Sequence, residues 1–426
     1  MKLVNIISNR AKMADVNNDN ATELVNVRLS TILVSNPLTG KLIKKIVVKP
    51  KVERSVEEYN RTLLRSVSTS ETLIERPSIS GEIIIKFELE DINNDGSPEF
   101  IILRADGIMA CYNFREKELW SIFKDPYVQD FCLFDIDNDG FKEIIAISRI
   151  GNLYIINHKG KVTTYPLEGI FGSPAFIGSI QHNGCYRLFV IVRDGVLYFL
   201  DIPRDSKGIF KRKKPLNVLN TIGLPKTGEP VIIDTQDINE DGREEIIIGF
   251  SDGKLIIVGS EGTVLQSYEL QDKIAFIATA STTDGNLVVI GDWIGNSLII
   301  KKRSVQIIPA LERTLDMDID NDGIVERIQV RSKKLVIKKN QKEILSVEGR
   351  SYITAFNLQD IDADDEVEVL VGWNSRSFSI YKTNGSRIAS TTTSAIPRVL
   401  LCIDVDNDGQ KEILCGGEGT LEIYKL

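Results

Sequence analysis

The sequence is poor in the residues on which most enzyme sites and disulfide scaffolds depend. Its 426 residues include two histidines, His158 and His182, both in turn-like stretches, which argues against histidine-based catalysis. The five cysteines are an odd number without a CxxC pair, so neither a disulfide framework nor a thiolate zinc site is expected. No Gly-x-Ser-x-Gly motif is present either. We therefore expect a protein that is not an enzyme.

Long apolar runs are also missing. No run reaches 18 apolar residues, and the start MKLVNIISNR lacks the apolar core and cleavage site of a signal peptide. The net charge of −8, from 52 basic and 60 acidic residues, opposes binding to a phosphate backbone. These features predict a cytoplasmic protein with no integral membrane segment and no nucleic-acid partner.

What the sequence does contain is one acidic motif in seven copies. Each copy is nine residues long, with Asp at position 1, Asp or Asn at position 3, Asp at position 5 and Glu at position 9. The copies begin at Asp15, Asp91, Asp135, Asp237, Asp318, Asp360 and Asp404. The shorter intervals give a period of about 44 residues, typical of repeat folds. Two longer gaps contain decayed copies, around residues 181–184 and 284–285, so we count nine units.

Within each unit the pattern indicates four short strands, with the acidic motif between the first and the second. Four strands in a repeat of this length are typical of a β-propeller blade. The predicted fold class is all-β, a single closed propeller over residues 1–426, with nine blades counted and seven or eight as alternatives. The last unit ends at its third strand, GTLEIYKL, so we expect the N-terminal strand KLVNIIS to complete it and cover its edge.

Two segments interrupt the repeat. Residues 50–81 form an insertion between the first two units, and the spacing of Val56, Tyr59, Leu63 and Val67 predicts a short amphipathic helix. It is interpreted as packing on the propeller, with a docking element as the alternative. The basic run 211–214 is interpreted as a solvated hairpin edge, with contact to an anionic membrane surface or nucleic acid as the alternative.

The motif positions carry oxygen ligands suited to a hard cation, because alternate carboxylates on a tight loop converge on one point. The candidate metal ligands are Asp15, Asn17, Asp19, Glu23, Asp91, Asn93, Asp95, Glu99, Asp135, Asp137, Asp139, Glu143, Asp237, Asn239, Asp241, Glu245, Asp318, Asp320, Asp322, Glu326, Asp360, Asp362, Asp364, Glu368, Asp404, Asp406, Asp408 and Glu412. An EF-hand does not fit, because its last ligand stands at position 12 and leads into a helix. The alternative is that these residues form Asx-turns without metal.

Calcium is the cation expected at these loops, with magnesium as the alternative. The loops beginning at Asp135, Asp318, Asp360 and Asp404 have four carboxylates and are expected to bind most tightly. The other three have Asn at position 3 and are expected to bind more weakly. The loop at Asp360 lacks the glycine found at position 6 of five copies.

The repeated D-x-[DN]-x-D-G-x-x-E, followed by an apolar strand, resembles the FG-GAP or VCBS-type repeats of the integrin α-subunit propeller. The resemblance covers nearly the whole chain outside residues 50–81. It implies a propeller of about seven blades with metal ligands at positions 1, 3, 5 and 9. The short repeats are most similar to small intracellular FG-GAP proteins that act as scaffold subunits, which implies other protein subunits as partners.

A protein-interaction scaffold in a cytoplasmic signalling or trafficking complex is therefore the leading hypothesis. The turns between the second and third strands should lie on the face opposite the acidic loops, and Trp and Arg dominate interface hot spots. The expected partner-binding residues there are Arg149, Arg193, Phe250, Trp293, Arg331 and Trp373. The alternative is a propeller lyase or hydrolase with its active site in the central channel.

Overall fold

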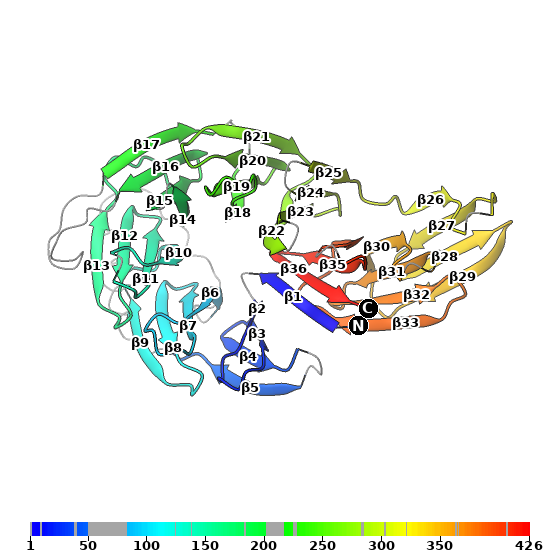
Figure 1. Ribbon diagram of the computed structural model, residues 1–426, viewed down its shortest axis with the longest axis horizontal. Coiled ribbons are helices and arrows are strands. Elements are labelled where there is room, and N and C mark those ends of the chain that lie inside the picture. Colours follow the sequence, from blue (N-terminus) through cyan, green and yellow to red (C-terminus); the bar gives the residue numbers. More distant parts are fainter. Residues whose placement is uncertain are drawn as a thin grey trace, which may run out of the picture. The chain divides into compact units, whose positions relative to one another are not determined.

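The computed structural model describes residues 2–8, 11–37, 41–49, 83–201, 217–224 and 228–426, apart from residues 124, 138, 183–184, 283–284, 302–303, 321, 363, 365 and 406–407. In these residues 36 strands form nine antiparallel sheets of four strands each (Figure 1). The nine sheets correspond to the nine repeat units, so the chain is an all-β protein built from propeller blades. Within the described ranges no helix is long and apolar enough to cross a membrane.

The chain forms two compact units, each described by itself. The first unit comprises Lys12–Pro230 with Ser260–Gly262. Its four sheets contain β2 (Ala11–Ala14), β3 (Glu23–Arg28), β4 (Thr31–Ser35) and β5 (Leu42–Val47); β6 (Ile84–Glu90), β7 (Glu99–Arg104), β8 (Ile108–Tyr112) and β9 (Glu118–Phe123); β10 (Val128–Phe134), β11 (Glu143–Ser148), β12 (Asn152–Ile156) and β13 (Val162–Pro166); and β14 (Pro174–His182), β15 (Cys185–Val192), β16 (Val196–Asp201) and β17 (Asn217–Gly223).

The second unit comprises Met1–Ala11, Val231–Gly259 and Thr263–Leu426. Its five sheets contain β18 (Pro230–Gln236), β19 (Glu245–Phe250), β20 (Lys254–Val258) and β21 (Val264–Glu269); β22 (Ile274–Thr282), β23 (Gly285–Asp292), β24 (Ser297–Lys301) and β25 (Ser304–Ile308); β26 (Thr314–Met317), β27 (Glu326–Arg331), β28 (Lys334–Lys339) and β29 (Lys342–Glu348); β30 (Ile353–Gln359), β31 (Glu368–Trp373), β32 (Ser377–Lys382) and β33 (Arg387–Thr392); and β34 (Val399–Ile403), β35 (Glu412–Gly417) and β36 (Thr420–Lys425) with β1 (Lys2–Ser8).

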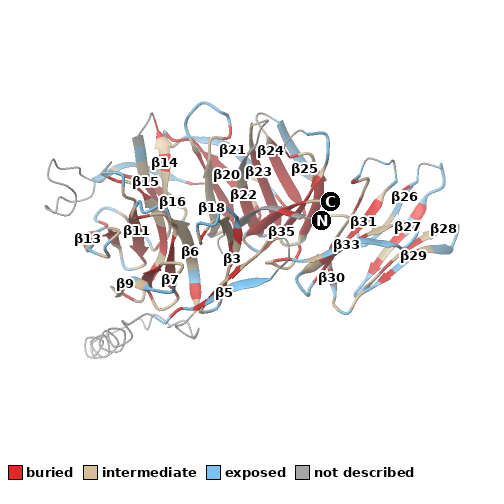
Figure 2. Ribbon diagram, turned by 60° about the horizontal axis from the view of Figure 1, so that its bottom comes forward, coloured by how far each residue is buried: buried red, intermediate tan, exposed pale blue. Residues whose placement is uncertain are grey.

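The second strand of most blades is buried along its whole length. In β7, β11, β19, β31 and β35 all six residues are buried, because each strand is apolar on both faces and is covered on both (Figure 2). The strand β27 differs, since its sequence ERIQVR alternates and exposes Arg327 and Arg331. The sheet of β26 to β29 is therefore covered on one face only.

The N-terminal strand completes the last blade, as the sequence predicts. The strand β1 pairs antiparallel with β36, with Lys2 opposite Lys425 and Ser8 opposite Thr420. The two strands run side by side in Figure 1. This pairing covers the edge of β36 that would otherwise present unpaired backbone groups.

Packing in the second unit does not simply follow the order of the blades in the chain. One hydrophobic core joins the sheet of β22 to β25 with the sheet of β34 to β36, although two other sheets lie between them in sequence. Phe276 on β22 fits between these sheets because Gly291 and Gly416 leave room for its ring; a Cβ at either glycine would come within 2.3 Å of it. The sheets of β26 to β29 and β30 to β33 share a separate core.

The insertion at residues 50–81, with its predicted helix, lies outside the described residues. The basic run at residues 211–214 lies outside them too. Both interpretations remain predictions from the sequence.

Candidate functional site

The seven acidic loops share one buried contact between their two ends. The glutamate at position 9 begins the second strand of its blade and is buried in every copy, with exposed fractions between 0% and 3%. One of its oxygens, Oε2, accepts a hydrogen bond from the backbone N–H of position 2. The pairs are Val16–Glu23, Ile92–Glu99, Ile136–Glu143, Ile238–Glu245, Ile319–Glu326, Ile361–Glu368 and Val405–Glu412, at 2.8 to 3.2 Å. We call this contact the glutamate latch.

The aspartates at positions 1 and 5 shape the turn between these ends. In the loop at Asp135, Oδ2 of Asp135 accepts from the N–H of Gly140 at 2.9 Å, and Oδ1 of Asp139 accepts from the N–H of Phe141 at 2.9 Å. Gly140 has φ of 88°, a left-handed conformation that favours glycine. These hydrogen bonds form Asx-type turns, as the alternative interpretation of the motif expects. Each carboxylate has two oxygens, so the turns are compatible with a cation as well.

The loops differ in what faces the second oxygen of the latch glutamate. In three loops the side-chain amide of Asn at position 3 donates to Oε1 of this glutamate. The pairs are Asn17–Glu23 at 3.3 Å, Asn93–Glu99 at 2.8 Å and Asn239–Glu245 at 3.2 Å. An uncharged donor thus satisfies the buried oxygen in these loops, which we call the asparagine loops.

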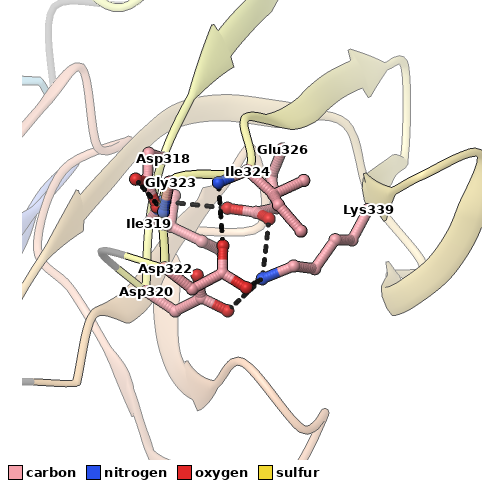
Figure 3. A network of polar contacts seen from close by, with 8 residues as sticks. All are labelled: Asp318, Ile319, Asp320, Asp322, Gly323, Ile324, Glu326 and Lys339. Atoms are coloured by element: carbon pink, nitrogen blue, oxygen red, sulfur yellow. Dashed lines mark hydrogen bonds and ion pairs between the residues drawn. The ribbon is translucent and has the colours of Figure 1, made fainter.

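Three other loops contain a lysine that the sequence did not single out. In the loop at Asp318, the ammonium of Lys339 lies 2.5 Å from Asp320 Oδ2, 2.6 Å from Asp322 Oδ2 and 3.2 Å from Glu326 Oε1 (Figure 3). Lys339 ends β28, the third strand of the same blade. These ion pairs raise the pKa of Lys339, so it stays charged.

The loops at Asp404 and Asp360 repeat this arrangement less completely. Lys425 at the end of β36 lies 2.8 Å from Asp408 Oδ2 and 3.2 Å from Glu412 Oε1. Lys382 at the end of β32 pairs with Asp364 Oδ2 at 2.8 Å. We call the loops at Asp318, Asp360 and Asp404 the lysine loops. Asp406 lies outside the described residues.

The loop at Asp135 has four carboxylates and no such lysine. The register of β11 with β12 pairs Ile144 with Ile156. It therefore places Asn157 opposite Glu143. The side-chain oxygen of Asn157 accepts hydrogen bonds from the backbone N–H groups of Lys159 and Lys161 in the following turn. No hydrogen-bond partner reaches the buried Asp137 Oδ1. Asp318 Oδ1 and Glu368 Oε1 in the lysine loops lack such a partner as well, so what distinguishes the loop at Asp135 is the uncharged residue opposite Glu143.

The pKa of the latch glutamate does not distinguish this loop, since burial also raises the pKa values of Glu99 and Glu245 to about 7. Burial, followed by the charges of Asp137, Asp139 and Asp135, raises the pKa of Glu143 to about 7. Burial raises the pKa of Asp137 as well, with further contributions from Asp139 and Asp135. His158, stacked on Phe141 with ring centroids 4.5 Å apart, has a pKa lowered by burial and is neutral at pH 7. Near Asp135, carboxyl oxygens of Asp135, Asp137 and Glu143 lie within 4.8 Å of one another.

Two of the expected partner-binding residues are in the core, which corrects the prediction. Phe250 is 0% exposed and Trp373 is 6% exposed. Both end the second strand of a blade, and the neighbouring sheet or link covers them. The ring of Trp373 lies so close to Gly349 that a Cβ there would come within 2.2 Å of it. Neither side chain is available to a partner.

Of the arginines in the predicted set, one is exposed and two are partly buried. In the first unit, Arg193 pairs with Glu229 at 3.1 Å, and Arg149 lies near enough for the charge of Arg193 to lower its pKa further, after burial. In the second unit, Arg331 is exposed.

Trp293, in the turn between β23 and β24, is partly exposed and lies between two cations. Arg398 and Lys273 lie over its ring, 4.8 and 5.9 Å from the centroid, and the indole N–H has no hydrogen-bond partner. The next residue, Ile294, is 51% exposed. A cleft of about 110 Å³ beside this turn is lined by Ile294, Arg313 and Arg398, with backbone from β30 and β34.

Comparison with known proteins adds little beyond the fold. No family model matches the chain, and no curated protein sequence matches it. Solved structures similar to it include BBS1N in complex with ARL6DN (12% identity, 80% of this chain and 90% of that chain covered, TM-score 0.42), BamB from Moraxella catarrhalis (13%, 83% and 97%, 0.37) and Saccharomyces cerevisiae Sqt1 (10%, 79% and 95%, 0.40). Likenesses this distant carry no information on partners or activity.

Proposed function

We propose that this protein is a non-catalytic scaffold that binds another protein through the surface around Trp293. The observation that carries the proposal is the placement of this indole: it is partly exposed, it lies beside a cleft, and two cations flank it. A planar aromatic side chain loses little entropy on binding and offers a large apolar area. With Arg313 and Arg398 in the cleft, the partner segment is expected to present acidic side chains around an apolar anchor.

Other described side chains support a role in binding rather than catalysis. Burial raises the pKa values of the thiols of Cys111, Cys132, Cys402 and Cys415, which disfavours the nucleophilic thiolate. His182 is buried and contacts the hydroxyl of Ser260 at 2.9 Å. We further propose that the repeats are of the FG-GAP type and that the protein works in a cytoplasmic complex, as the motif resemblance implies.

The same resemblance implies a divalent cation, and we propose that calcium binds the loop at Asp135. The residues there fit such an ion, because carboxyl oxygens of Asp135, Asp137 and Glu143 lie within 4.8 Å of one another, Asn157 rather than a lysine stands opposite Glu143, and one oxygen of Asp137 has no hydrogen-bond partner among the described residues. Asp135, Asp137, Asp139 and Glu143 would hold it. When bound, the cation would neutralise the loop and stabilise the fold without taking part in chemistry.

Affinity purification with the full chain as bait tests the scaffold role. We expect a protein in stoichiometric amount, and Trp293→Ala should weaken its binding by about 2 kcal/mol, roughly thirtyfold, with the fold unchanged. Lys159→Ala, at an exposed turn of the first unit, is the matched control and should bind normally. Recovery of a tightly bound small molecule with no protein would instead support the alternative of an enzyme.

A further inference from the structure

Charge is distributed over the seven loops by a simple rule. At positions 1, 3, 5 and 9, an asparagine loop has three carboxylates, and the residue opposite its latch glutamate is uncharged: Asn36, Asn113 or Gly259 by the strand register. A lysine loop has four carboxylates and one lysine, so four negative charges and one positive charge again give −3. A lysine opposite the latch glutamate thus occurs only in loops whose position 3 is Asp. The loop at Asp135 alone keeps a charge of −4.

The ammonium of Lys339 lies where a bound cation would lie. It contacts carboxylates from positions 3, 5 and 9, which are three of the four positions expected to ligate a metal ion. Its side chain is 19% exposed and comes from the blade that carries the loop. Figure 3 shows the ammonium in the centre of the three carboxylates. In the loop at Asp318 an ammonium thus occupies the place that the sequence analysis assigned to a divalent ion.

A tethered ammonium is a strong competitor for such a place. Its pairing with the carboxylates costs no translational entropy, since the strand holds it at a high effective concentration. A calcium ion a few ångströms from the same ammonium would meet a strong repulsion, so the lysine side chain would first have to leave its three carboxylates. The loop geometry persists without metal because the glutamate latch is made by the backbone N–H of Ile319.

We infer that Lys339, Lys382 and Lys425 act as built-in counter-ions that keep the three lysine loops free of divalent metal and leave the loop at Asp135 as the four-carboxylate loop that binds it. This inference rests on the cation-binding part of the proposed function and limits it to fewer loops. Among the described residues, Lys339 contacts three carboxylates of its loop, so this loop should exclude metal strongly.

Isothermal titration of the EDTA-treated full chain with Ca²⁺ tests the inference. Lys339→Met keeps the length of the side chain and removes its charge, so it should add one calcium site and tighten binding at that loop at least about tenfold. Lys338→Met is the matched control, since neighbouring residues of a strand point to opposite faces, and it should leave the stoichiometry unchanged. Circular dichroism checks that both variants are folded.

A reciprocal pair examines the loop at Asp135. Asn157→Lys places an ammonium opposite Glu143 and should abolish calcium binding at this loop. Asn157→Met loses the same turn hydrogen bonds without adding charge, and it should keep the site. If both variants lose calcium binding, the turn is damaged, and this pair of variants no longer supports an effect of charge opposite Glu143.

Two results would overturn the inference. One is a wild-type protein whose calcium stoichiometry falls when Asp320 and Asp322 are changed to Asn, since that loop would then bind metal despite Lys339. The other is a folded Lys339→Met variant that gains no site. If the wild-type protein binds no calcium anywhere, the proposed cation site fails, but the gain expected for Lys339→Met still decides the role of the lysine.

Discussion

The loops at Asp135 and Asp318 have the same carboxylates at positions 1, 3, 5 and 9. They differ in the residue that faces these negative charges. In the loop at Asp318, Lys339 from β28 pairs with three carboxylates. In the loop at Asp135, Asn157 takes the equivalent place and serves the turn that follows. Under our proposal, this one residue on a neighbouring strand decides whether the same acidic motif is neutralised by its own chain or by an added cation.

The largest effect is expected from removing the latch that both loops share. Glu143→Ala and Glu326→Ala each leave a buried backbone N–H without its acceptor, at Ile136 and Ile319, and should lower the free energy of unfolding by about 2 to 4 kcal/mol. Urea unfolding followed by circular dichroism measures this. Glutamine at either position keeps an acceptor oxygen and should cost less. A loss of stability in only one of the two variants would show that the glutamate latch does not serve both loops alike.

Neutral substitutions in the two loops should change stability in opposite directions without metal. Asp137→Asn relieves repulsion among unpaired carboxylates and should raise the melting temperature in EDTA by about 2 °C. Asp320→Asn removes a partner of Lys339 and should lower it by a similar amount. Scanning calorimetry in EDTA and again in excess calcium provides the measurement. Shifts of the same sign would mean that Lys339 does not neutralise its loop.

The pH dependence of stability should reflect the burial of the latch glutamates, since the pKa values of Glu99, Glu143 and Glu245 are all raised to about 7. The pKa of Glu143 is about 7 in the folded protein, raised chiefly by burial, and near 4.5 when unfolded. The folded state therefore keeps a proton that the unfolded state has lost, so the metal-free protein should lose stability as the pH rises from about 4.5 to about 7. Glu143→Gln should reduce this slope without abolishing it, because Glu99 and Glu245 still titrate in the same range, and saturating calcium should do the same. A slope unchanged by either would contradict the assigned role of Glu143.

The smallest effect is expected from converting an asparagine loop. Asn93→Asp gives the loop at Asp91 four carboxylates with Asn113 opposite, as in the loop at Asp135. It should cost about 0.5 to 1 kcal/mol without metal, since Glu99 loses its amide donor. The variant should also gain stability from calcium, measured as a rise in melting temperature with calcium concentration. No gain would show that more than charge distinguishes the loop at Asp135.

The blades and the latch positions could be predicted from the sequence because they depend on local order. An acidic turn followed by an apolar run such as Glu143 to Ser148 fixes a turn and a buried strand within a dozen residues. The pairing of β1 with β36 was also predictable, from the missing fourth strand of the last unit. The decayed copies near residues 181–184 and 284–285 form sheets as expected, since strand pairing does not need the carboxylates.

The lysines and the buried aromatic residues could not be predicted in the same way. Lys339 is 13 residues after Glu326, and the two meet only through the register of β27 with β28. Trp293 and Trp373 look alike in sequence, since both are predicted to lie in a turn between a second and a third strand. Their exposure differs because the ring of Trp373 covers Gly349 in the shared core of two sheets, whereas Trp293 packs at the margin of its core.

The pairing of β1 with β36 makes the order of synthesis important. Residues 2–8 are synthesised before their partner at residues 420–425, and about 400 residues lie between the two strands. At typical elongation rates of about 5 to 20 residues per second, β1 waits roughly 20 to 80 seconds for its place in the sheet. During that time it is an unpaired strand that other nascent chains or chaperones can capture. The sheet of β34 to β36 can therefore be completed by β1 only after β36 has been synthesised.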